Sequence, residues 1–245
     1  MTTEAEITVE TADGPMPAHE ASPEGPARGA VLVIQEAFGV TSHIRDIARR
    51  LADAGWYAVA PALFHRDGSP VLAYDDFDSV MPLMKHLSAE GLTADLDATL
   101  DHLEARDFAP AQIGVVGFCM GGTVTYYAAT LRPLGAAVTF YGGGVLEGRF
   151  GLPSLIELAP TLQAAWLGLY GDLDKGIPAT QVEQLRAAVK GAPVPTEIVR
   201  YPDADHGFNC NDRPAVYNPE AAADAWKRTL AWFDSHLPSG GNPET

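Results

Sequence analysis

The stretch "GFCMGGT", residues 117–123, places a cysteine between glycines directly after an apolar run. It fits the pattern G-x-C-x-G-G, which is typical of a nucleophile held at a sharp turn between a strand and a helix. Its glycines are Gly117, Gly121 and Gly122. Side chains at these positions would collide with neighbouring backbone in so strained a turn. A thiol presented in this way, that of Cys119, could attack a carbonyl carbon.

A helix that begins after Cys119 would favour the thiolate, because free N–H groups and the positive end of the helix dipole point at the sulfur. The N–H of Met120 is expected to stabilise a developing oxyanion. Two other interpretations compete with a nucleophile. The G-x4-G spacing from Gly117 to Gly122 suggests a phosphate-binding loop, but Thr123 stands where the lysine is required. The second alternative is an inert cysteine buried in a close-packed turn.

A thiol nucleophile needs an imidazole base that is oriented by a carboxylate. His206 follows the strand-like "TEIVRY", and Gly207 beside it would permit a tight turn. Asp174 lies just before the helix that Pro178 opens, and we prefer it as the acid over Asp172, which could instead fix its own turn. The order nucleophile, acid, histidine is that of α/β-hydrolases.

Other titratable residues fit these roles less well. Asp203 and Asp205 share the loop of His206 and would need a cramped return toward it. His65 ends a strand and could line a pocket, but it precedes the nucleophile in the chain. The remaining histidines considered occur in helix-like or polar segments, where we expect solvated side chains: His43, His86, His102 and His236.

Alternating apolar runs and amphipathic patterns must position these residues. Strands are predicted at 30–35, 56–64, 112–118, 134–143, 163–172 and 196–202. Helices are predicted at 43–55, 93–106, 121–131, 179–190 and 221–237. This alternation predicts an α/β fold with a mostly parallel central sheet and helices on both faces. We expect one domain over residues 1–245 with a frayed tail at 238–245, and a ligand crevice at the carboxyl ends of the strands.

Composition excludes several classes of partner. The 245 residues include 16 Lys plus Arg against 32 Asp plus Glu, for a formal charge of −16. This charge argues against binding to nucleic acid or to an anionic membrane surface. No signal peptide and no apolar run of about 20 residues is visible. Two cysteines do not make a disulfide framework, so we expect free thiols and a cytoplasmic location.

With Cys119, Asp174 and His206 in these roles, the chain resembles the dienelactone hydrolase family (carboxymethylenebutenolidases) over roughly residues 5–237. The motifs that carry the resemblance are "VIQEAFGV" (33–40), "GFCMGG" (117–122), "FYGGG" (140–144), "GDLDKGIP" (171–178) and "DHGF" (205–208). It implies an α/β-hydrolase fold and a Cys-His-Asp triad that opens lactones or esters without a cofactor. A monomer or small homo-oligomer is expected.

The resemblance also implies roles for the loop after the first predicted strand. Glu36 would contact the nucleophile in the resting enzyme and help to control when the thiolate forms. The N–H of Ala37 would be the second oxyanion donor beside Met120. From its position alone, Glu36 ends an apolar strand, so it should be partly desolvated and in need of a partner.

The chain departs from the family pattern in the substrate pocket. Members that act on dienelactone hold its carboxylate with arginines, one of them four residues after the catalytic histidine. Cys210 stands at that position here, and Arg213 is the nearest replacement. We therefore expect a neutral lactone, small ester or thioester. The side chains that could line an apolar pocket are Phe38, Tyr74, Tyr141 and Phe208.

The sequence thus predicts a hydrolase that acts on a small-molecule ester or lactone. The alternatives are a thioesterase, another hydrolase that cleaves a C–C or carbon–halogen bond, and a non-catalytic relative that only binds a small ligand. No metal is predicted, because neither H-E-x-x-H nor C-x2-C occurs.

Overall fold

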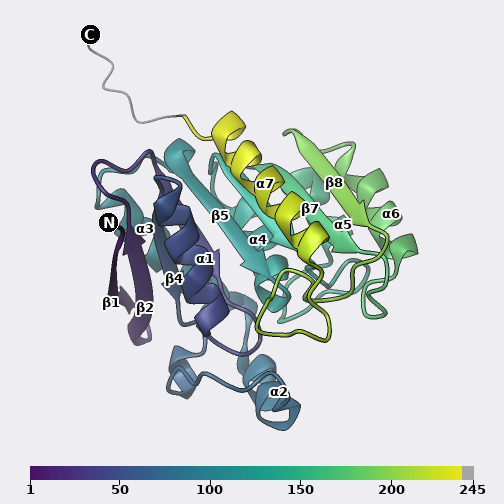
Figure 1. Cartoon of the computed structure of the whole chain (residues 1–245), viewed down its shortest axis with the longest axis horizontal. Coiled ribbons are helices and arrows are strands. Elements are labelled where there is room, and N and C mark those ends of the chain that lie inside the picture. The colour runs from purple at the N-terminus through teal and green to yellow at the C-terminus, as the bar shows by residue number, and fades with distance from the viewer. Residues whose placement is uncertain (239–245) are drawn as a thin grey trace.

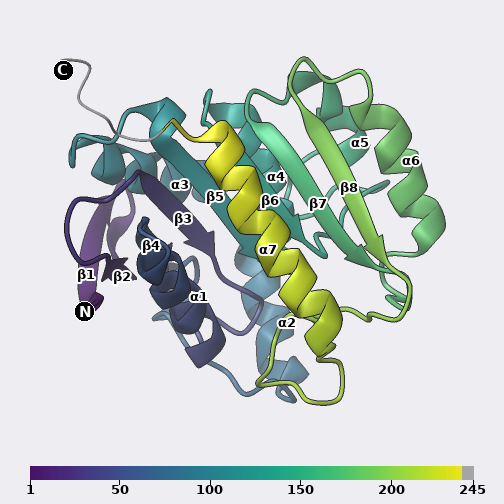
Figure 2. The same cartoon turned by 45° about the horizontal axis from the view of Figure 1, so that its top comes forward.

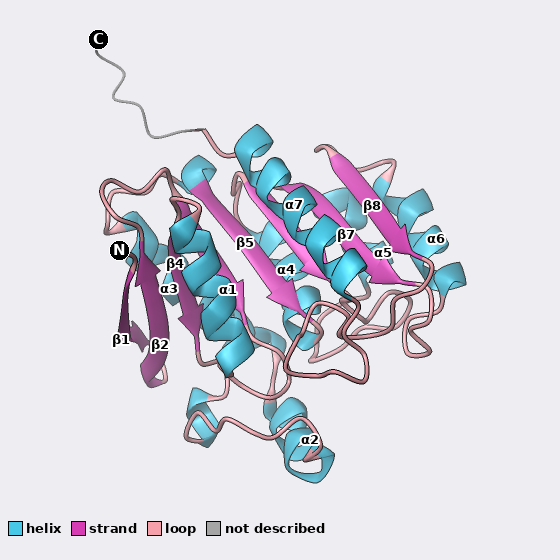
Figure 3. Ribbon diagram, viewed as in Figure 1, coloured by secondary structure: helices cyan, strands magenta, loops and turns pink. Residues whose placement is uncertain are grey.

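The strands of the computed structural model, which describes residues 1–238, form one sheet in the order β1-β2-β4-β3-β5-β6-β7-β8 (Figure 3). β2 is antiparallel to both β1 and β4, and all other pairs are parallel. The strands are β1 (Thr3–Thr11), β2 (Gly14–Ser22), β3 (Ala30–Ile34), β4 (Tyr57–Pro61), β5 (Ile113–Phe118), β6 (Ala136–Phe140), β7 (Ala165–Gly171) and β8 (Thr196–Tyr201). Of the tail predicted to fray, residues 239–245 lie outside the described residues.

Helices cover both faces of the sheet, as Figures 1 and 2 show. One face carries α1 (Ser42–Asp53) and α7 (Pro219–His236). The other carries α3 (Ala89–Glu104), α4 (Met120–Leu131), α5 (Leu155–Leu158) and α6 (Ala179–Val189). α2 (Phe77–His86) lies beyond the ends of the strands (Figure 1). The predicted α/β-hydrolase fold is confirmed.

Each buried strand contributes to two cores because its side chains alternate between the faces. In β3, Val31 and Val33 belong to the core beneath α1 and α7, whereas Leu32 and Ile34 belong to the core beneath α3 and α4. This explains why the strands are apolar without interruption, as parallel sheets covered on both sides require.

The parallel strands end at a common edge, on the side where α2 lies (Figure 1). The loops that follow them carry the residues singled out from the sequence: Glu36 after β3, Cys119 after β5, Tyr141 after β6, Asp174 after β7 and His206 after β8. Among residues 1–238, no helix combines the length and the apolar character that a membrane crossing requires.

Candidate active site

Cys119 occupies the turn between β5 and α4 as the N-cap of the helix. Its backbone has φ 56° and ψ −117°, a conformation that is strained for a residue with a side chain. Two hydrogen bonds fix it: the Cys119 N–H donates to the Phe140 carbonyl at 3.1 Å, and the Gly122 N–H donates to the Cys119 carbonyl at 3.0 Å. The sulfur therefore stands at the start of a helix, on a partly exposed residue.

The glycines of the turn are required by close backbone contacts. A Cβ on Gly117 would lie 2.6 Å from the carbonyl carbon of Gly121. A Cβ on Gly121 would lie 2.5 Å from the Ile34 carbonyl oxygen, and one on Gly122 would lie 2.6 Å from that of Phe140. The three glycines thus allow α4 to begin directly against β3 and β6.

His206 and Asp174 are joined by a hydrogen bond of 2.6 Å between Nδ1 and Oδ2. The other carboxylate oxygen of Asp174 accepts hydrogen bonds from the N–H groups of Gly176 at 2.8 Å and Ile177 at 3.1 Å. The competing Asp172 instead binds the Arg200 guanidinium with both oxygens, at 2.6 and 2.7 Å. Asp174 therefore orients the imidazole, while Asp172 is engaged in an ion pair.

The electrostatics of this pair favour a charged imidazolium. Burial alone would lower the pKa of His206, but the charge of Cys119 and the hydrogen bond to Asp174 together raise it to about 10. Burial would raise the pKa of Asp174, but the hydrogen bond and charge of His206 and the two N–H groups hold it below its ordinary value. Cys119 and Asp174 both raise the pKa of this imidazole, so each lies near it.

Glu36 lies in the loop after β3 with 1 % of its surface exposed. Neither of its carboxylate oxygens has a hydrogen-bond partner within residues 1–238. Burial raises its pKa, and the charge of the nearby Arg213 and the hydroxyl of Tyr74 oppose this shift. The sequence predicts that Glu36 is partly desolvated, and in the structure its desolvation is complete. No group within the described chain is a hydrogen-bond partner for its carboxylate.

Ala37 lies in the turn after β3, and Met120 is the first residue of α4. Their backbone N–H groups are the two donors expected to stabilise an oxyanion. Both residues are buried, and within the described part of the chain neither N–H donates a hydrogen bond. One unengaged donor thus occurs in the loop after β3, and the other occurs at the first residue of α4, directly after Cys119.

The aromatic residues expected to line a pocket fall into two groups. Tyr141 packs 5.0 Å from the His206 ring, and its hydroxyl is buried without a partner among residues 1–238. Phe208 lies 5.4 Å behind Tyr141, within the core beneath α1 and α7. Phe38 and Tyr74 contact each other at 4.8 Å. Contact of these side chains with a substrate stays a prediction.

A groove of about 350 Å³ adjoins Tyr74 and Arg213. The Arg213 guanidinium lies over the rings of Phe38 and Tyr74, at 5.7 and 5.4 Å from their centroids. It passes close to Gly207, where a Cβ would lie 2.6 Å from Arg213 Nη1, and the φ of +85° at this position favours glycine. Arg213 forms no ion pair with a carboxylate in the part of the chain that is described.

The solvated role expected for His43 is wrong. Its side chain is 2 % exposed and packs edge-on against Phe118 at 5.5 Å. The spacing in the sequence indicates this burial, because His43 precedes Ile47 and Leu51 at intervals of four residues on the buried side of α1. The side chain of His65 is also buried, and its Nε2 is 3.0 Å from Asp95 Oδ1.

Cys210 is fully buried, and its thiol donates to the Tyr74 hydroxyl at 3.3 Å. Burial, with the charge of Glu36, raises the pKa of Cys210 to about 11. The Tyr74 hydroxyl is also 3.1 Å from Thr41 Oγ1. This contact joins positions 41, 74 and 210, and no sequence motif signals it.

Comparison with known proteins gives a consistent result. A family model described as "Dienelactone hydrolase family" matches residues 16–237. The "Putative carboxymethylenebutenolidase" of Escherichia coli O157:H7 is 40% identical over 230 residues, which cover 90% of this chain and 83% of the relative. The protein of the same name from Salmonella typhimurium is 42% identical over 226 residues, 89% of this chain and 82% of its own.

A solved structure shows the same similarity in three dimensions. The crystal structure of a "Putative Dienelactone Hydrolase" from Klebsiella pneumoniae superposes with a TM-score of 0.87 and 39% sequence identity. The superposition covers 96% of this chain and 99% of that one.

Proposed function

Because the chain belongs to the dienelactone hydrolase family, and is therefore related to hydrolases, we propose that it cleaves carboxylic esters or lactones with Cys119 as the nucleophile. One observation carries the proposal. A cysteine in a strained turn at the start of α4 acts on the pKa of a histidine whose other side is hydrogen-bonded to Asp174. This arrangement provides a nucleophile, a proton carrier and an orienting carboxylate.

In the first step, the Cys119 thiolate attacks the carbonyl carbon, and the carbonyl oxygen becomes an oxyanion. The unengaged N–H groups of Ala37 and Met120 stabilise this charge. As the tetrahedral intermediate collapses, the C–O bond to the leaving group breaks and the His206 imidazolium donates its proton to the departing alkoxide. Cys119 is left acylated as a thioester.

In the second step, neutral His206 removes a proton from water, and the resulting hydroxide attacks the thioester carbonyl. The carboxylic acid product leaves, and Cys119 departs as a thiolate beside the imidazolium of His206. Asp174 keeps the imidazole in one orientation throughout, because its second oxygen is fixed by two backbone N–H groups. No cofactor is needed for either step.

Glu36 is proposed to control the thiol proton in the resting enzyme. Glu36 and Cys119 both lie near enough to the buried Tyr141 for their charges to raise its pKa. A carboxyl group whose pKa is raised by burial can hold a proton at a pH where an exposed one cannot.

We propose a neutral lactone or small ester as the preferred substrate. Arg213 is stacked over Phe38 and Tyr74 and its charge acts on Glu36, so it is already engaged before substrate binds. The formal charge of −16 further disfavours anions. We also propose a single-domain cytoplasmic enzyme that is a monomer or a small homo-oligomer.

Turnover of a neutral aryl ester, cis- and trans-dienelactone and a thioester by the full chain tests the proposal. We expect the neutral ester to react fastest and the thioester to react more slowly. Acid quench should trap an acylated Cys119 that mass spectrometry detects. The substitution Cys119→Ala should abolish turnover. Iodoacetamide should label Cys119 faster than the buried Cys210. Equal labelling rates together with full turnover by Cys119→Ala would refute the nucleophile, and faster dienelactone turnover would refute the neutral substrate.

A further inference from the structure

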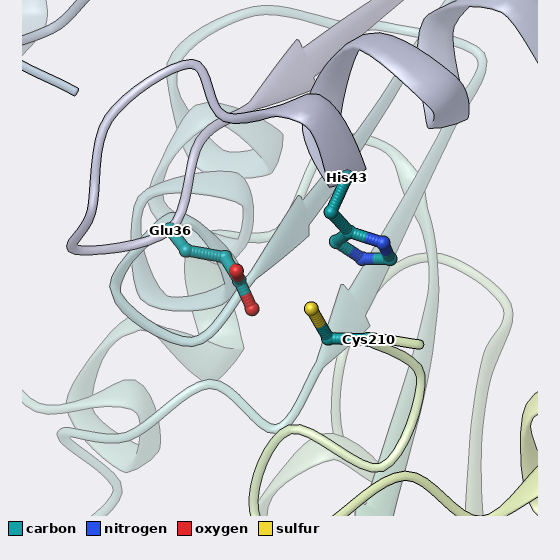
Figure 4. Close-up of side chains that lie close together, drawn as sticks. All are labelled: Glu36, His43 and Cys210. Atoms are coloured by element: carbon teal, nitrogen blue, oxygen red, sulfur yellow. The ribbon is translucent and has the colours of Figure 1, made fainter. Parts of the chain in front are cut away.

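Glu36, His43 and Cys210 meet in the interior beside the candidate active site. One ligand atom from each, a carboxylate oxygen, a ring nitrogen and the thiol sulfur, lies within 4.8 Å of the other two. Figure 4 shows the three side chains turned toward a common space from the loop after β3, the first turn of α1 and the loop between β8 and α7. All three residues are buried.

The polar atoms of this cluster are not satisfied by the described chain. Both carboxylate oxygens of Glu36 and both ring nitrogens of His43 are without a hydrogen-bond partner among residues 1–238. Cys210 Sγ donates to the Tyr74 hydroxyl, and the backbone of Asp212 also acts on this thiol. Leaving such groups buried and unpaired is unfavourable, and more so for a charged group. Their convergence on one space therefore points to a bound species that accepts lone pairs.

We propose that Glu36, His43 and Cys210 bind a divalent transition metal of the zinc type. Imidazole nitrogen, thiolate sulfur and carboxylate oxygen form a mixed ligand set that suits Zn²⁺, whereas Mg²⁺ and Ca²⁺ require oxygen ligands. Three protein ligands leave a fourth position open. The site differs from the Cys119, Asp174 and His206 group, and its ligands have no motif spacing because they lie at positions 36, 43 and 210.

The geometry requires only small side-chain movements. Ligand bonds of 2.0–2.3 Å in a tetrahedron place the ligand atoms about 3.3–3.8 Å apart, so the cluster must close by about 1 Å. Binding releases the Cys210 thiol proton to solvent, together with the proton of Glu36 where that carboxyl group is protonated. The thiolate and the Glu36 carboxylate then balance the metal charge, and the Tyr74 hydroxyl can donate to the sulfur. Asp212 adds favourable charge to this space, and Arg213 opposes it.

Metal binding would inhibit hydrolysis, a consequence that rests on the proposed function. If Glu36 controls the thiol proton of Cys119, a metal that holds its carboxylate removes that control and fills the space beside the nucleophile. The binding itself does not depend on the reaction, so the two parts can fail separately.

Titration of the metal-stripped full chain with Co²⁺ tests the binding without any substrate. Co²⁺ takes the place of Zn²⁺, and a thiolate ligand gives a charge-transfer absorption in the near ultraviolet beside the visible bands of four-coordinate cobalt. We expect these bands to saturate at one Co²⁺ per chain and Zn²⁺ to displace them. We expect Cys210→Ala to lose the thiolate band. We expect His43→Phe to lose the bands of four-coordinate cobalt. Phe at position 43 retains an aromatic contact with Phe118.

Two matched variants separate this site from other metal-binding groups. Cys119→Ser removes the other thiol, and His86→Ala removes an exposed histidine, so both should bind Co²⁺ like the unchanged chain. Circular dichroism verifies that each variant is folded. The rise in Tm on addition of Zn²⁺ provides a second measurement of binding. We expect this rise to be absent from Cys210→Ala and His43→Phe, whichever of them folds. Absence of bands in the unchanged chain, the thiolate band retained in a folded Cys210→Ala, or bands lost in Cys119→Ser would overturn the proposal.

The inhibition is measured with the neutral ester, each variant being compared with its own metal-free rate. We expect stoichiometric Zn²⁺ to reduce turnover by at least about tenfold in the unchanged chain and by less than about twofold in Cys210→Ala. Co²⁺ binding without inhibition overturns only the inhibitory role. Binding in a chain that hydrolyses no ester, even without metal, overturns the proposed function and leaves the metal site intact.

Discussion

The side chain of Cys119 illustrates how single residues are prepared for chemistry here. Its backbone is strained, and it stands beside a histidine whose pKa is raised to about 10. The strained backbone is kept in place because the Cys119 N–H donates to the Phe140 carbonyl and the Cys119 carbonyl accepts from the Gly122 N–H. The thiol at position 210 has no such preparation, since it is buried and donates to Tyr74. We therefore expect the two cysteines of this chain to differ in reactivity because their surroundings differ.

Asp174→Asn is expected to lower kcat for the neutral ester by about 10²- to 10⁴-fold. The amide cannot stabilise the imidazolium, so the pKa of His206 should fall from about 10 and the alkaline limb of the pH–rate profile should move to lower pH. The measurement is kcat/KM from pH 5 to 11. Asp172→Asn, which breaks only the pair with Arg200, is the matched control. A normal profile in Asp174→Asn would contradict the orienting role.

Stability should also depend on pH through His206. Its pKa is about 10 when folded and ordinarily 6.5, so the folded state binds more protons between these values. The stabilisation is fully present below pH 6.5 and is lost as the pH rises through about 10. Urea unfolding of the unchanged chain and His206→Gln should therefore show a free-energy difference that is largest near pH 6 and smallest near pH 10.5. A difference that grows with pH would have the wrong sign.

At the scale of elements, the buried strands and their helices could be predicted and the peripheral ones could not. The strand predicted at 112–118 is observed as β5, and the helix predicted at 179–190 as α6. No element was predicted for β1 or α2. β1 is an edge strand with mostly exposed residues, and α2 contains Pro82, which is unfavourable inside a helix. These elements form because they pair with or pack against the rest of the chain, which local patterns do not encode.

The close contact between α4 and β3 provides a test at this scale. Gly121→Ala places a Cβ 2.5 Å from the Ile34 carbonyl oxygen, which is backbone and cannot rotate away. We expect the free energy of unfolding to fall by about 1–3 kcal/mol and ester turnover to be lost, since Cys119 must shift. Denaturant unfolding and kcat are the measurements.

Gly191→Ala is the matched control, because its Cβ would meet only the Ala188 carbonyl oxygen at 3.8 Å. Its stability should change by less than about 0.5 kcal/mol, with kcat unchanged. Equal effects of the two substitutions would show that the turn tolerates side chains.

At the scale of the whole molecule, charge sets the approach of substrates. The formal charge of −16 repels anions at long range, while Arg213 is a single local cation near the groove. Raising the ionic strength from about 0.01 M to about 0.15 M shortens the Debye length from about 30 Å to about 8 Å. We expect kcat/KM for an anionic aryl ester to rise severalfold and that for a neutral ester to stay constant. A fall for the anionic ester would mean that Arg213 dominates its capture.

By itself the sequence determined the α/β alternation and the cysteine turn, because each is a signal of local spacing, and it predicted the order of nucleophile, acid and histidine. The packing of distant segments decided the rest. It made Asp174 rather than Asp172 the hydrogen-bond partner of His206, and it turned Arg213 across Gly207. It also buried Glu36, His43 and Cys210 together. Residues that far apart in the chain acquire a common function only when the sheet brings its loops to one edge.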